Sequence, residues 1–170
     1  MTNPTRLMVI VAALLIALGA WELTSGYRLV SDDYGFAVRF PAKPAEKSSK
    51  NYEGLPMSLW TWEDDSAQEF FSAEATSYKE PLNPAGNWIP AGRELSGVGV
   101  QIIDVRRFTM HSPRTGRDVL AIETTGRQIL SGDLLETIWL VDERTLISVT
   151  ARTHNQRQRE AFLKSLSLLR

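Results

Sequence analysis

The 170-residue sequence contains no cysteine and only two histidines. The absence of cysteine excludes disulfides, thiolate catalysis, iron–sulfur clusters and cysteine-ligated zinc. It also excludes the acylated cysteine by which a bacterial lipoprotein is anchored. The scarcity of histidine leaves few candidates for acid–base chemistry near neutral pH. We expect neither a cofactor nor a metal site.

A strong charge of one sign is also missing, because 19 basic and 20 acidic residues give a formal net charge of -1. Nucleic-acid binding needs a concentrated basic face, so we expect no nucleic-acid partner. The hydrophobic share of 43% and the charged share of 23% are typical of a globular protein. This length favours one globular domain, which we place at residues 27–170, after an N-terminal segment at residues 1–26.

The N-terminal segment holds an uncharged apolar run that begins at Leu7, directly after Arg6, and ends at Trp21. As a helix the run would span roughly 22 Å at ~1.5 Å per residue, less than the ~30 Å hydrocarbon core of a bilayer. That length is typical of a secretory signal, and Ala17 and Gly19 supply part of a cleavage site. An uncleaved segment would instead place Trp21 at the membrane interface. An ordinary buried helix is the third interpretation.

The position of the positive charge before this run predicts that the rest of the chain lies outside the cytoplasm. We expect the domain on the periplasmic side of the inner membrane. It would be either tethered to the membrane through the run from Leu7 to Trp21 or cleaved and soluble.

Alternating apolar residues and turn residues predict a series of antiparallel hairpins. "YRLV" and "FAVRF" flank the turn "SDDYG", and Pro41 and Pro44 stop the second of these strands because proline lacks the N–H of a ladder. A second hairpin is expected around the turn "EDDS". Four further strands in residues 100–153, joined by "SPRTG", "GRQILSGD" and "ER", predict an antiparallel meander.

Two segments outside the strands have different character. Residues 79–99 are rich in proline and glycine and predict a long irregular connection, with at most one helical turn near residues 93–95. Residues 155–169 predict an amphipathic helix with Asn155 as N-cap, and with Phe162 and Leu166 on one face. We expect eight residues to be buried together: Phe36, Val38, Phe40, Ile122, Trp139, Ile147, Val149 and Phe162.

The two ends of the domain resemble those of the PsbP/Mog1-like fold family. "YGFAVRFPAKP" is similar to the family's opening strand, which reads Gly, Phe, a short alternation and then Phe-Pro. "TLISVTARTHNQRQREAFLKSLSLL" is similar to its closing unit, in which Phe162, Leu163 and Ser165 match the end of the helix. Leu166 stands where the family usually has an aromatic residue, and residues 83–99 are a poor helix where relatives carry one.

The resemblance implies an α+β fold, with an antiparallel β-sheet of about six to seven strands and helices packed on its faces. An N-terminal hydrophobic helix would precede this domain. A terminal helix would cover one face of the sheet, followed by a last short strand. Relatives include extracytoplasmic bacterial proteins and accessory subunits of photosystem II. The motifs that match are short and apolar, so no functional site can be transferred from these relatives to this sequence.

Candidate catalytic groups are few. His111 ends a predicted strand, and His154 lies where a strand gives way to the last helix; both positions are typically solvated, and their charged sequence neighbours are mostly basic. No Gly-x-Ser-x-Gly elbow is present. The carboxylates cluster at residues 32–33 and 63–65, without the alternate spacing of a calcium loop. Asp in hairpin turns is ordinary.

A possible interaction surface consists of two groups of residues. Trp60 and Trp62 share one face of a predicted strand and would either form a ligand or partner surface or pack inside the domain. Arg152, Arg157 and Arg159 near the last helix would either contact anionic lipid or an acidic partner, or form a solvated face.

These features leave three hypotheses for function. The first is a non-catalytic, exported or membrane-tethered domain that assists an envelope or membrane protein complex through a protein partner not identified by sequence. The alternative is a module that binds a small molecule or a lipid near the tryptophans. The third is an enzyme, most plausibly a hydrolase, for which the sequence offers no constellation of catalytic residues.

Overall fold

The structure, a computed structural model, describes residues 26–51, 53–83 and 99–170. Its strands form two antiparallel sheets. The small sheet has the order β1-β2-β10 and consists of β1 (Tyr27–Ser31), β2 (Phe36–Phe40) and β10 (Ser167–Leu168). The large sheet has the order β3-β4-β5-β9-β8-β7-β6.

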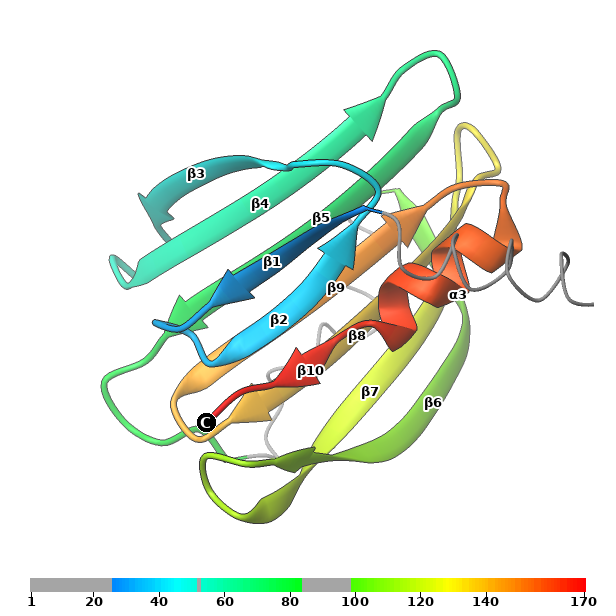
Figure 1. The fold of residues 1–170 in the computed structure, drawn as a ribbon. Coiled ribbons are helices and arrows are strands. Elements are labelled where there is room, and N and C mark those ends of the chain that lie inside the picture. The colour runs from blue at the N-terminus through cyan, green and yellow to red at the C-terminus, as the bar shows by residue number, and fades with distance from the viewer. Residues whose placement is uncertain (1–25, 52, 84–98) are drawn as a thin grey trace, which may run out of the picture.

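The large sheet is built almost entirely from neighbours in sequence. Its strands are β3 (Ala45–Lys50), β4 (Pro56–Asp64), β5 (Glu69–Ser77), β6 (Val100–Ser112), β7 (Arg117–Gln128), β8 (Leu134–Asp142) and β9 (Thr145–Arg152). The helix α3 (Gln156–Lys164) follows β9. The small sheet and α3 lie on the same face of the large sheet (Figure 1).

The predicted hairpins and meander are confirmed, but the arrangement of the sheets differs from the prediction. The sequence predicted one sheet with helices on its faces, whereas the described residues form two sheets and contain one helix. The first hairpin, β1–β2, is not part of the large sheet but belongs to the small sheet, which covers one face of the large one (Figure 1). One strand was missed, namely β3, which is polar and lies at an edge, whereas the last short strand implied by the family resemblance is present as β10.

The prolines after "FAVRF" have a clear structural role. Pro41 follows the last residue of β2, and the new strand β3 begins directly after Pro44. Because β2 belongs to the small sheet and β3 to the large one, the break carries the chain from one layer to the other. An unbroken strand would have stayed within one ladder.

The hydrophobic core lies between the two sheets and α3. The Phe162 ring of α3 meets the rings of Phe40 and Phe71 in edge-to-face contacts, with centroid separations of 5.2 Å and 5.0 Å. Phe36 packs in the same way against Trp60, at 5.6 Å. Edge-to-face pairs stabilise a core beyond the burial of their surface.

The predicted core is confirmed for six of its eight residues, and Ile122 and Trp139 are the exceptions. These two are paired across β7 and β8, next to the pair Ala121 and Leu140, which does lie in the core. Because successive side chains of a strand point to opposite faces, Ile122 and Trp139 belong to the other face of the large sheet. There the Trp139 Nε1–H donates to the Thr124 hydroxyl at 3.3 Å.

The helix α3 begins as predicted. The Asn155 side chain accepts a hydrogen bond from the Gln158 N–H at 3.3 Å, which caps the N-terminus. The helix ends at Lys164, before the predicted end, and residues 167–168 pair with β2 instead.

The expected N-terminal hydrophobic helix and the expected turn near residues 93–95 lie outside the described residues. Within the described ranges, no helix combines the length and the apolar character needed to span a bilayer.

Candidate functional site

A groove runs between α3 and the small sheet, with a volume of about 1130 Å³. Its walls carry four basic side chains and one acidic side chain: Arg28, Arg39, Arg157, Lys164 and Glu160. Apolar residues contribute to its lining, among them the partly exposed Pro41 and Ala161. The groove therefore offers both an excess of positive charge and apolar contact surface.

The antiparallel hairpin places two of the arginines side by side. Arg28 of β1 is directly opposite Arg39 of β2. Their neighbours Leu29 and Val38 point into the core, so Arg28 and Arg39 project from the outer face of the small sheet. Like charges directly opposite each other destabilise a sheet. An anion bound between them would relieve that repulsion.

The third arginine comes from the first turn of α3. Arg157 is exposed and lines the groove opposite the small sheet. In the described part of the chain, neither Arg28 nor Arg157 has a hydrogen-bond or ion-pair partner for its side chain. Their charges are thus available to a ligand.

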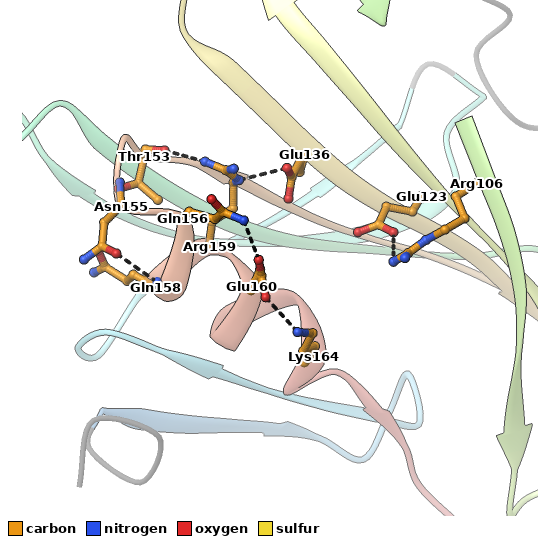
Figure 2. A network of polar contacts seen from close by, with 10 residues as sticks. All are labelled: Arg106, Glu123, Glu136, Thr153, Asn155, Gln156, Gln158, Arg159, Glu160 and Lys164. Atoms are coloured by element: carbon orange, nitrogen blue, oxygen red, sulfur yellow. Dashed lines mark hydrogen bonds and ion pairs between the residues drawn. The ribbon is translucent and has the colours of Figure 1, made fainter. Parts of the chain in front are cut away.

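The wall formed by α3 is held in place by polar contacts that the core-facing side of the helix makes (Figure 2). Arg159 is buried; its Nη1–H donates to the Thr153 carbonyl at 2.9 Å, and its Nε lies 2.9 Å from a Glu136 carboxylate oxygen in an ion pair. Glu69 of β5 accepts hydrogen bonds from Thr153 at 2.9 Å and from Gln158 at 3.2 Å. These contacts fix the helix against β5 and β8.

The exposed side of α3 carries a separate chain of polar contacts, also drawn in Figure 2. Lys164 donates to the Glu160 carboxylate at 2.8 Å, and Gln156 donates to its other oxygen at 2.8 Å. The hydrogen bond from Lys164, followed by that from Gln156, holds the pKa of Glu160 below its usual range. Glu160 therefore offsets part of the positive charge at the Lys164 end of the groove.

A smaller hollow of about 470 Å³ lies on the other side of α3, against β6, β7 and β8. Arg106 and Glu123 form an ion pair in its wall. Asp104 and Glu136 add negative charge to the lining, so this hollow lacks the positive excess of the groove. No histidine lines either of the two hollows in the described residues.

Each histidine faces a carboxylate, which corrects the expectation of basic surroundings. His111 and Asp118 are opposite each other on β6 and β7, and the His111 Nδ1 lies 3.1 Å from an Asp118 oxygen. The His154 Nε2 lies 3.6 Å from Asp133. Strand pairing creates the first of these contacts. The side chains of His111, Asp118 and His154 are 64%, 65% and 70% exposed, so neither pair sits in a water-excluded site.

The five residues predicted as a possible interaction surface are not brought together. Trp60 is only 4% exposed and Trp62 packs against the core, so the tryptophans belong to the interior. Arg159 is buried against Glu136, and Arg152 is paired with Glu63 at 3.6 Å. Arg157 alone of the five lies in the wall of the groove and is exposed. Trp60 therefore follows the alternative in which the tryptophans pack inside the domain, and Arg159 is buried as well.

The predicted acidic turn at residues 63–65 is a local structure of the β4–β5 hairpin. Asp64 accepts hydrogen bonds from the Ser66 hydroxyl at 2.6 Å and from the N–H groups of Ser66 and Ala67. The Ser66 hydroxyl and then the Ala67 N–H hold the pKa of Asp64 below its usual range. Among the described residues, no three histidine, aspartate or glutamate side chains are grouped to bind a metal.

Sequence reasoning missed Arg28 and Arg39 as members of a site. A signal for both was present, since they lie in the strands flanking the turn "SDDYG" and become opposite neighbours once the hairpin closes. The packing of α3 beside that hairpin had no local signal. Only tertiary structure brings Arg157 to the same groove.

The comparisons with known proteins identify the fold. No protein-family model matches the sequence, and no curated protein sequence matches it. The chain is similar to the solution structure of cyanobacterial PsbP (CyanoP) from Synechocystis sp. PCC 6803, with a TM-score of 0.52 and 14% sequence identity. The match covers 84% of this chain and 91% of that one. The chain therefore has a PsbP-like fold, as the resemblance of its two ends predicted.

Proposed function

We propose that this protein is a non-catalytic, exported or membrane-tethered domain that assists an envelope or membrane protein complex. The observation that carries the proposal is the groove beside α3, which gathers Arg28, Arg39 and Arg157 without any histidine. Such a surface binds anionic groups, and its lining in the described residues contains no histidine to act as an acid or base near neutral pH. A PsbP-like fold is compatible with an accessory role.

The alternative of a ligand-binding module is supported by the size of the same groove. Its volume of about 1130 Å³ is comparable to that of sites that hold whole small molecules. The tryptophans, however, lie in and against the core and do not form the pocket that this alternative placed near them. A ligand would therefore bind beside α3 and not near Trp60.

Complementation of a strain that lacks the gene separates the accessory domain from an enzyme. We expect the double variant Arg28→Gln, Arg157→Gln to lose complementation, because it removes two of the four basic side chains of the groove. The matched control is Arg107→Gln, Arg117→Gln, which removes two exposed arginines outside the groove. This control is expected to complement as the parent does.

The double variant His111→Ala, His154→Ala completes this experiment. We expect it to complement fully, because both imidazoles are exposed and lie outside the groove. Loss of complementation by a folded, correctly exported histidine variant would overturn the non-catalytic proposal and put a histidine-dependent site first.

The location of the domain needs its own test. A reporter that is active only in the cytoplasm, fused after Arg170, should be silent, and a reporter active only outside the cytoplasm should be active. The motive is the uncharged run that follows Arg6. A cytoplasmic signal from this fusion would contradict export.

A further inference from the structure

We propose that the groove beside α3 binds the anionic headgroups of the membrane surface next to which the domain is held. In this arrangement α3 and the outer face of the small sheet rest on the bilayer. The inference rests on the proposed function in one respect, which is that the domain lies beside a membrane. It adds the ligand of the groove and the orientation of the domain.

The length of the chain between the apolar run and the groove limits their separation. Arg28 is seven residues after Trp21, the last residue of the run. A fully extended chain spans at most ~3.6 Å per residue, so seven residues reach roughly 25 Å. While the run is in the membrane, the wall of the groove that contains Arg28 is therefore kept close to the lipid surface.

The chemistry of the groove matches a phosphate-bearing headgroup. Guanidinium groups bind phosphate oxygens through paired hydrogen bonds, and Arg28, Arg39 and Arg157 present three of them. Bound phosphates would also screen the repulsion between the opposed Arg28 and Arg39. The partly exposed Pro41 and Ala161 in the lining offer apolar contact to the glycerol and upper acyl region.

The dimensions of the groove exclude a free phosphate as its full occupant. The volume of about 1130 Å³ exceeds what a single small anion fills. An acidic segment of a protein partner has suitable charge and size and is the competing occupant. The short connection to the apolar run favours lipid, because it brings headgroups to the groove without a partner.

One feature of the same end of the domain opposes contact with an anionic surface. The turn of the β4–β5 hairpin carries Asp64 and Asp65. It lies at the end of the large sheet where β9 leads into α3, since Phe70 of β5 pairs with Arg152 of β9. Figure 1 shows this hairpin turn on the far side of β9 from α3. Lipid contact is therefore confined to the side of the groove.

The absence of cysteine permits an experiment on the full chain with one labelled site. Ser167→Cys places a bimane fluorophore in the lining of the groove, and Thr109→Cys places it on exposed β6 as the control. Each labelled chain is reconstituted in phosphatidylcholine vesicles with a headgroup-attached nitroxide quencher, with and without phosphatidylglycerol. We expect phosphatidylglycerol to at least double quenching at position 167 and to leave position 109 unchanged.

The Arg28→Gln, Arg157→Gln double variant should lose this dependence on phosphatidylglycerol at position 167, whereas Arg107→Gln, Arg117→Gln should keep it. Equal quenching with and without phosphatidylglycerol overturns the proposal, as does equal quenching in the groove variant and the parent. In detergent, inorganic phosphate and a synthetic hexaglutamate peptide are added to the labelled chain. A change of bimane emission with either probe, without any effect of phosphatidylglycerol, would assign the groove to that anion and not to lipid.

The outcome is distinguishable from failure of the accessory role. If complementation requires Arg28 and Arg157 but quenching does not depend on phosphatidylglycerol, the proposed accessory role stands and the proposed lipid contact is overturned. A chain whose histidine variant fails to complement loses the non-catalytic role, whatever the quenching shows.

Discussion

The Ser165 hydroxyl oxygen accepts a hydrogen bond from the backbone N–H of Arg39 at 2.8 Å, across 126 residues of sequence. Ser165 also donates to the Phe162 carbonyl at 2.6 Å. One side chain thus ends α3 and joins it to β2, beyond the point where β10 pairs with that strand. These two hydrogen bonds hold together the two walls of the groove.

Replacing this hydroxyl should weaken the junction. Ser165→Ala leaves the Arg39 N–H without its partner, and we expect the free energy of unfolding to fall by about 1–2 kcal/mol. The measurement is urea denaturation. Ser167→Ala is the matched control, because Ser167 also lines the groove but its side chain makes no hydrogen bond within the described residues. Equal stability of the two variants would show that the Ser165 contact contributes nothing.

Phe162 should be the most costly residue of α3 to truncate. Phe162→Ala removes a ring that packs against Phe40 and Phe71. Because this leaves a cavity, we expect the free energy of unfolding to fall by about 3–5 kcal/mol. Phe70→Ala is the control, since Phe70 is only half-buried and points to the other face of β5. The docking of α3 is wrong if Phe162→Ala unfolds at the same denaturant concentration as the parent.

The buried ion pair between Arg114 and Asp142 is expected to be strongly coupled. The fully buried Asp142 carboxylate accepts a hydrogen bond from Arg114 at 3.0 Å and one from Ser112 at 3.2 Å. Arg114→Met leaves this charge without a cationic partner and should lower the free energy of unfolding by about 3 kcal/mol. This value is at the low end for breaking a buried pair, because Arg114 is partly exposed.

A double-mutant cycle checks this coupling. The double variant Arg114→Met, Asp142→Asn should lose much less unfolding free energy than the sum of the losses of the two single variants, because no unpaired charge remains. Arg117→Met, in the same hairpin but exposed, should be close to neutral. Strict additivity of the two changes would contradict the coupling.

Glu74 should give the protein an unusual dependence of stability on pH. Burial raises the pKa of Glu74, so the folded state holds its proton to higher pH than the unfolded state does. This contribution to stability is present below the pKa of the unfolded chain, about 4.3, and is lost as pH rises through the folded-state value. Glu74→Gln should therefore stabilise the protein at neutral pH, and the gain should shrink as pH falls through the folded-state pKa and be absent below pH ~4.

Glu160→Gln is the control, for which the opposite change in stability is expected at neutral pH. Hydrogen bonds from Lys164 and Gln156 lower the pKa of Glu160, so its contribution is present above the unfolded-state pKa and is lost on acidification. The two variants should shift the urea midpoint in opposite directions at neutral pH. A midpoint for Glu74→Gln below that of the parent at neutral pH would contradict the effect of burial.

Much of the fold was predictable because its signals are local. Alternation in "FAVRF", turn residues between strands and the N-cap Asn155 each act within a few residues, and β2, the meander and α3 appear where these signals lie. The strand β3 was missed because its polar sequence carries no alternation, and it forms only by pairing with β4. The strand β10 is two residues long and depends on β2.

The sequence by itself determined the hairpins, the capped helix and the order of the elements, because backbone preferences and side-chain alternation are properties of short segments. Only tertiary structure decided which layer each hairpin joins and which face each residue occupies. Alternation places Ile122 and Trp139 together but does not say which face meets the small sheet. The groove likewise arises from packing: Arg28 and Arg157 are distant in sequence, and the docking of Phe162 against Phe40 places them in the two opposite walls of one groove.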